Sequence, residues 1–168
     1  LLNSWYRVAV VAVPAAFGHA VNPIGIALVT AIIASFGEST VAAFGVATRV
    51  ESFAVIPMLA LSAVIGPVVG QNWGAQQVDR VRSALKQSFA ACFVWALVLA
   101  VTFWLSAEVI ASVFTSDAEV SALAAKYLYI VPLSVWGYGW TIVAAGAYNA
   151  IGKSITGLGF YLTRTAMF

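Results

Sequence analysis

Long apolar runs separated by short polar segments constrain this chain more than any other feature of its sequence. A helix that crosses a membrane needs about 20 mostly apolar residues. Four runs reach that length, at approximately residues 8–35, 41–69, 85–114 and 120–150. A fifth begins near residue 155 and is truncated at residue 168. The sequence therefore predicts an all-α, polytopic transmembrane helix bundle with about four full spans and the start of a fifth.

The composition agrees with a chain whose solvent is lipid. Of its 168 residues, 62% are hydrophobic and 8% are charged, whereas a soluble domain carries about 25% charged residues. The net charge of +2 is too small to favour nucleic acid as a partner. The single cysteine, Cys92, lies inside an apolar run and is expected to be a small buried hydrophobe. No disulfide framework or metal site is predicted.

The apolar runs are longer than a hydrocarbon core of roughly 30 Å requires at 1.5 Å per residue. We therefore expect them to tilt, bend or protrude. Proline removes a backbone donor and clashes with the preceding turn, so the prolines are the expected bend points. They are Pro14, Pro23, Pro57, Pro67 and Pro132. Ser116 or Asp117 is expected to cap the fourth helix.

The charged residues divide between the two sides of the predicted bundle. With alternating spans, one side receives Arg7, Arg80, Arg82, Lys86 and Lys153, with Arg164 somewhat deeper. The other side receives Glu38, Asp117 and Glu119, near Lys126. Lys and Arg are enriched in cytoplasmic loops. The start of the chain, the loop 71–83 and the turn 151–154 are therefore predicted to be cytoplasmic, in a multi-pass protein of the plasma or inner membrane.

Polar side chains within the first apolar run form one candidate site. His19 and Asn22 are three residues apart, and Thr30 continues the same helix face. Polar groups are costly in lipid and generally serve a function or a helix contact. They could line a cavity that binds substrate or carries a proton, with His19 as the candidate for proton coupling because histidine titrates near neutral pH. The alternative is hydrogen bonding between helices.

The second run carries the charged pair Arg49 and Glu51. Residues two apart on a helix do not face each other, so these two cannot pair directly. Each needs a partner on another helix, a water-filled cavity or a route to the interface. The functional interpretation is coordination of a cation or substrate. The alternative is a structural ion pair, with Arg49 reaching outward.

Hydroxyl and aromatic side chains gather on the fourth run. They are Ser134, Trp136, Tyr138, Trp140, Thr141 and Tyr148. Such a patch suits a flat, cationic or amphiphilic ligand. We assign Tyr138 to a cavity, and Trp136 and Trp140 to packing against lipid and helices. Glycines at positions 137, 139 and 146 leave room for close helix approach. The sequence contains no nucleophile elbow, zinc-protease motif or phosphate-binding loop, so no enzyme is predicted.

Four motifs in register resemble the multidrug and toxic compound extrusion (MATE) family of transporters. The first is Gly70-Gln71-Asn72-Trp73-Gly74-Ala75, followed by Arg80. The others lie at residues 37–49, 114–120 and 145–153. The resemblance covers nearly the whole chain.

This resemblance implies part of a transporter of twelve helices in two lobes. Residues 1–168 correspond to helices 7 to 10 and the start of 11, a partial C-terminal lobe whose N-terminal partner lobe is missing. The implied activity is antiport by alternating access, exporting drugs and organic cations against an inward proton or sodium gradient, with no cofactor. Such a fragment is expected neither to transport nor to fold well by itself.

One departure from the family pattern concerns the coupling ion. Some members carry membrane-embedded acids on helices 7 and 10, where this chain has His19, Asn22 and Pro23, and Tyr138. A sodium site in this lobe is therefore not expected, and coupling would use protons or the missing lobe. Two alternatives remain open. A lipid-linked precursor flippase would need a wider, more basic cavity, and a non-transporting membrane scaffold would have little reason to hold buried charges.

Overall fold

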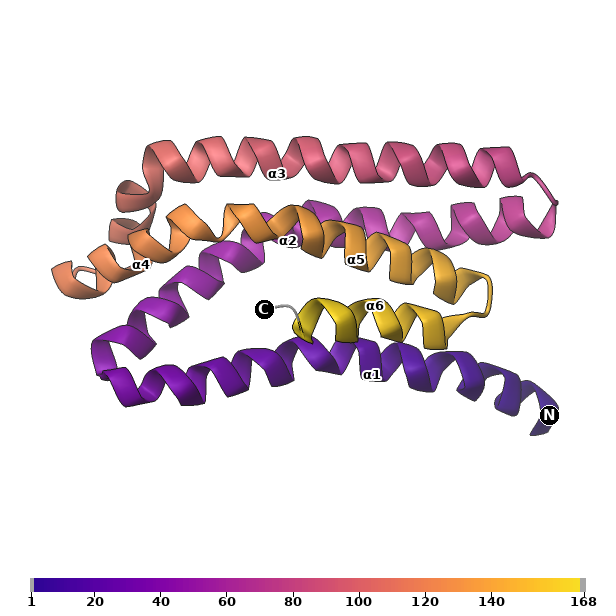
Figure 1. Ribbon diagram of the computed structural model, residues 1–168, viewed down its shortest axis with the longest axis horizontal. Coiled ribbons are helices and arrows are strands. Elements are labelled where there is room, and N and C mark those ends of the chain that lie inside the picture. The colour runs from indigo at the N-terminus through magenta and orange to yellow at the C-terminus, as the bar shows by residue number, and fades with distance from the viewer. Residues whose placement is uncertain (1, 167–168) are drawn as a thin grey trace.

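The computed structural model describes residues 2–166, which form a bundle of helices (Figure 1). In chain order these are α1 (Leu2–Ile33), the 3-10 turn η1 (Ala34–Phe36), α2 (Glu38–Gly74), α3 (Val78–Phe114), α4 (Ala118–Ile130), α5 (Pro132–Ala150) and α6 (Ser154–Ala166). Within the described residues, 3 helices are long and apolar enough to cross a membrane, or up to 4 if α4 and α5 form one broken span. The predicted all-α membrane bundle is confirmed.

The helices alternate in direction as the charge pattern requires. Figure 1 shows the start of α1, the α2–α3 turn and the α5–α6 turn at one end of the bundle. Helix α2 packs mainly against α5, α3 and α4, whereas α1 packs mainly against α6. The bases Arg80, Arg82, Lys86 and Lys153 therefore belong to the same end of the molecule. Its assignment to the cytoplasm stays a prediction of the positive-inside rule.

The predicted loop 71–83 is wrong in extent. Helix α2 continues to Gly74 and α3 begins at Val78, which leaves a turn of residues 75–77. The turn is a Schellman motif, in which Gln77 N donates to Asn72 O at 2.8 Å and Gln76 N to Trp73 O at 3.0 Å. Gln76 takes the left-handed conformation at φ 58°. The polar residues of the predicted loop therefore mark where α2 and α3 leave the apolar region, and both helices continue beyond that point.

The α5–α6 turn, which the sequence predicted at residues 151–154, uses the same motif. Lys153 N donates to Tyr148 O at 2.9 Å, and Gly152 N donates to Asn149 O at 3.1 Å. Gly152 has φ 77°, a conformation that glycine adopts without strain.

The predicted fourth span, 120–150, is two helices. Helices α4 and α5 meet at Val131 with a bend of 60°. Pro132 begins α5, where the missing N–H would have had no helical partner. Asp117 caps α4, with its Oδ1 accepting hydrogen bonds from Glu119 N at 2.8 Å and Val120 N at 3.1 Å. The expected bend at Pro132 and the cap at Asp117 are both confirmed.

Small residues let α5 approach its neighbours closely, as predicted at Gly139 and Gly146, whereas nothing lies within 4 Å of a Cβ added at Gly137. Ser62 Oγ of α2 donates to Ile142 O of α5 at 2.9 Å. A Cβ added at Gly146 would lie 3.1 Å from Ser62 O. A Cβ added at Gly139 would lie 2.8 Å from Met58 Sδ and 3.0 Å from Cys92 Sγ. Cys92 is 1% exposed, which confirms it as a small buried hydrophobe.

Candidate functional site

A cluster of half-buried polar side chains joins helices that are far apart in sequence. We call this set the polar cluster; it consists of Asn22 of α1, Glu51 of α2, Tyr127 of α4, Tyr138 of α5 and Arg164 of α6. Because ionisable groups are expensive in lipid, side chains that hold one another between helices are the first candidates for function.

Arg164 contacts the most helices within the polar cluster. It lies ten residues into α6, or about 15 Å from the start of that helix, which is near the middle of a core of about 30 Å. Its Nη2 donates to Asn22 Oδ1 at 3.0 Å. Its guanidinium carbon lies 4.7 Å from the centroid of the Tyr138 ring, within range of a cation–π interaction. One cation thus joins α1, α5 and α6.

The carboxylate of the cluster comes from α2. Tyr127 Oη donates to Glu51 Oε2 at 3.2 Å. Arg164 is close enough to Glu51 for the two charges to attract each other. Glu51 therefore has the partners on other helices that its position required. Arg49, by contrast, is exposed and forms no salt bridge within the described part of the chain, which agrees with its predicted outward path.

Other predicted site residues lie beside the cluster or use their hydroxyls locally. His19 is exposed, one helical turn before Asn22, with its ring centroid 5.7 Å from that of Tyr161. Thr30 Oγ1 donates to Ile26 O at 2.7 Å, and Thr141 Oγ1 donates to Gly137 O at 2.8 Å, each within its own helix. The structure thus brings together Asn22, Glu51 and Tyr138, and leaves the threonines outside.

The tryptophans of α5 lie on its outer side, as predicted. Trp136 is 44% exposed and Trp140 is 42% exposed. Their rings meet edge to face at 5.5 Å, and Trp140 Nε1 donates to Phe89 O of α3 at 3.2 Å. Tyr138, between them in sequence, is half-buried under Arg164.

The loop motif of the sequence forms the end of α2. Gly70 approaches Ala150 of α5, since an added Cβ would lie 3.7 Å from Ala150 O. Asn72 Nδ2 donates back to Val68 O at 2.8 Å. Ala75 is the C-cap, with its N–H bonded to Gln71 O. In the structure the motif closes the helix and its turn, and it does not contact the polar cluster through any of these bonds.

Sequence reasoning missed Arg164 and Tyr127 as members of the site. The charge pattern groups Arg164 with the bases at the cytoplasmic end, and Tyr127 is not among the candidate residues named from the sequence. The available signal was the distance of Arg164 from the turn at 151–153, because an arginine ten residues into an apolar helix is too deep for the interface.

Long apolar helices that hold an acid and a base between them are typical of polytopic membrane proteins in which such charges mark substrate or ion pathways, as in transporters. The comparison with known families agrees with that class. The MatE profile matches residues 14–167, and the chain belongs to this family of transporters, which are not enzymes.

Two curated relatives are identical to this chain at about a quarter to a third of the aligned positions. The FAD transporter of Shewanella oneidensis is 33% identical over 164 residues, which is 98% of this chain and 36% of that protein. The "Probable multidrug resistance protein NorM" of Bacillus cereus is 27% identical over 127 residues, which is 76% of this chain and 28% of that protein.

Two crystal structures of the Vibrio cholerae MATE transporter VcmN have the same fold. A single-residue mutant of VcmN superposes with a TM-score of 0.95 at 28% identity, covering 99% of this chain and 38% of that one. The bent form gives 0.94 at 27% identity, covering 100% and 38%. The chain therefore spans between 28% and 38% of the length of these relatives.

Proposed function

We propose that residues 1–168 are part of the C-terminal lobe of a secondary active exporter in the cell membrane. The exporter moves small amphiphilic or cationic organic molecules by alternating access, driven by a proton or sodium gradient. The observation that carries this proposal is the polar cluster, in which Glu51 and Arg164 are half-buried between helices. A passive scaffold would gain little from charges held in that position.

Glu51 is the residue that would carry the coupling proton. It is the one carboxylate of the polar cluster, and it is held by Tyr127 and attracted by Arg164. Binding a proton would remove its negative charge and with it the attraction to Arg164 across the helices. The electrostatic attraction between α2 and α6 would then weaken, which is the type of change that an alternating-access cycle needs. A single carboxylate offers few oxygens for sodium, so the cluster favours protons over Na⁺.

Drug resistance in a bacterial strain without its own exporters tests this proposal in the full-length transporter. We expect Glu51→Gln, and to a lesser degree His19→Ala, to lower resistance at unchanged membrane expression. Glu108→Gln is the matched control, because Glu108 is an exposed acid of α3 outside the cluster. Normal resistance in both the Glu51 and the His19 variants would refute the site assignment.

A second candidate substrate class is an anionic aromatic molecule such as a flavin nucleotide. Arg164 supplies a positive charge beside the Tyr138 ring, an arrangement that suits a phosphate with an attached ring system. The FAD transporter of Shewanella oneidensis covers 98% of this chain. Flavin release and cationic-drug resistance should be measured together in Arg164→Gln. A selective loss of flavin release would support the anionic class, and a selective gain would oppose it.

A further inference from the structure

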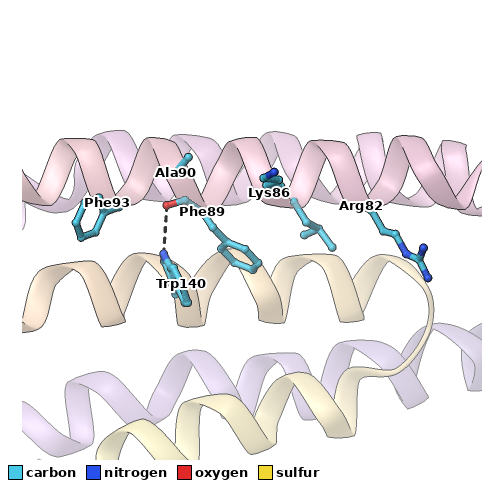
Figure 2. Close-up of a pocket in the computed structure, with 7 residues that line it drawn as sticks. Arg82, Lys86, Phe89, Ala90, Phe93 and Trp140 are labelled. Atoms are coloured by element: carbon cyan, nitrogen blue, oxygen red, sulfur yellow. Dashed lines mark hydrogen bonds between the residues drawn. The ribbon is translucent and has the colours of Figure 1, made fainter.

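An open groove lies on the outside of the bundle between α3 and α5 (Figure 2). It has a volume of about 550 Å³ and is lined by Arg82, Leu85, Lys86, Phe89, Ala90, Phe93 and Trp140. None of these residues belongs to the polar cluster. The groove is basic at one end and aromatic along the rest of its length, so it needs a separate explanation.

The groove follows one face of α3 for the depth of about one leaflet. Six of the lining residues lie on α3, at residues 82, 85, 86, 89, 90 and 93, and this pattern of steps of three and four places them on a single helix face. Figure 2 shows Arg82 at one end of this row and Phe93 at the other. Eleven residues separate them, a rise of about 16 Å. This is close to half of a hydrocarbon core of about 30 Å.

The floor of the groove is apolar. The rings of Phe89 and Trp140 lie 5.0 Å apart, and the indole N–H of Trp140 is already donated to Phe89 O at 3.2 Å. Phe93 is 56% exposed and Trp140 is 42% exposed. A floor with its polar hydrogen already bonded suits a hydrocarbon chain and offers little to a polar ligand.

The basic end of the groove selects for negative charge. Arg82 and Lys86 are four residues apart on the same face and are both exposed. Asp79, fully exposed, is the acid beside them, 3.9 Å from Arg82. Two bases against one acid leave a net positive charge, which would attract a phosphate and repel an organic cation. These bases belong to the end predicted to be cytoplasmic, where anionic lipid headgroups collect.

We propose that this groove holds an anionic phospholipid of the inner leaflet. Its phosphate lies between Arg82 and Lys86, and one acyl chain runs along Phe89, Phe93 and Trp140. The charge at one end, the apolar floor and the one-leaflet length match a phospholipid in its membrane orientation. A protein partner would not need the two bases at the end of the groove nearest the membrane surface and the aromatic side chains deeper in the membrane. The site is independent of the transported substrate.

Quenching of Trp140 by brominated lipids tests the proposal on the purified full-length chain in detergent. The Trp140 signal is obtained by subtracting the fluorescence of a Trp140→Phe variant. We expect phosphatidylglycerol with brominated acyl chains to quench this signal at a several-fold lower mole fraction than brominated phosphatidylcholine. Arg82→Gln combined with Lys86→Gln should abolish the preference. Arg80→Gln combined with Lys153→Gln, two bases at the same end outside the lining, should keep it.

Three outcomes would overturn the proposal. Equal quenching of the unmodified protein by both lipids would mean that the groove is ordinary lipid-facing surface. No quenching by either lipid would mean that protein covers the groove. Loss of the preference in the control pair as well would assign it to general surface charge. The first two outcomes are measured with the unmodified protein and Trp140→Phe alone, so they can be decided even if the double variants fold poorly.

Discussion

Arg164 Nη2 and Asn22 Oδ1 lie 3.0 Å apart, and this hydrogen bond joins α6 to α1. Asn22 is uncharged, so it orients the guanidinium without neutralising it. The positive charge stays available to the Tyr138 ring and to the Glu51 carboxylate. An aspartate at position 22 would form a tighter pair with Arg164 but would compete with Glu51 for its charge.

Replacing Asn22 by leucine should destabilise the protein, because Arg164 would lose its hydrogen-bond acceptor in a half-buried place. Leaving such a donor without a partner costs about 1–3 kcal/mol. The measurement is the thermal midpoint of the full-length protein in detergent. Thr30→Val is the control on the same helix, since the Thr30 hydroxyl bonds only to its own backbone. Equal midpoints for the two variants would contradict the role of Asn22.

Glu51→Gln and Tyr127→Phe should be non-additive in transport rate. Each removes one partner of the same hydrogen bond, and contacting residues show coupling in a double-mutant cycle. We expect the double variant to transport little worse than Glu51→Gln alone. Initial rates in proteoliposomes under an imposed proton gradient provide the test. Multiplicative losses would show that the two residues act independently.

Gly139→Ala should overpack the contact of α5 with α2 and α3. The new methyl would lie 2.8 Å from Met58 Sδ and 3.0 Å from Cys92 Sγ. Overpacking of this kind costs typically about 1–3 kcal/mol. Gly137→Ala is the matched control, two residues away on the same helix, because nothing lies within 4 Å of its added Cβ. Unfolding in detergent should separate the two variants, and a neutral Gly139→Ala would argue against this packing.

Gly152→Ala should weaken the α5–α6 turn. At φ 77° an alanine would be strained in a way that glycine is not. The expected cost is about 1 kcal/mol. Gly74→Ala, at the helical end of α2 with open space around its Cβ, should be close to neutral. Proteolysis at the turn is a direct readout, and faster cleavage is expected only for the Gly152 variant.

The positions of the helices could be predicted from the sequence because lipid imposes a length on every apolar run. Span alternation and the sorting of the bases to one end followed from the same reasoning. The ends of α2 and α3 could not be predicted in this way. Hydropathy reports where a helix leaves the membrane, whereas hydrogen bonds such as Gln77 N to Asn72 O determine where it stops.

The polar cluster was only partly predictable. Asn22, Glu51 and Tyr138 could be selected as polar residues inside apolar runs. Their joining depended on α6 lying against α1 and α5, and that arrangement is a property of the folded bundle. The charge pattern groups Arg164 with the charged residues nearest to it in sequence. Its position ten residues into α6, however, places it near the membrane depth at which Glu51 needs a positively charged partner.

The close fit of α2 and α5 has a mechanical consequence. The hydroxyl of Ser62 is bonded to the backbone of α5, and Gly146 leaves no spare space against the backbone of α2. Neither helix can slide past the other without breaking that bond or opening a gap. We therefore expect α2 and α5 to move together as one rigid unit, so that a displacement of either helix also displaces the other.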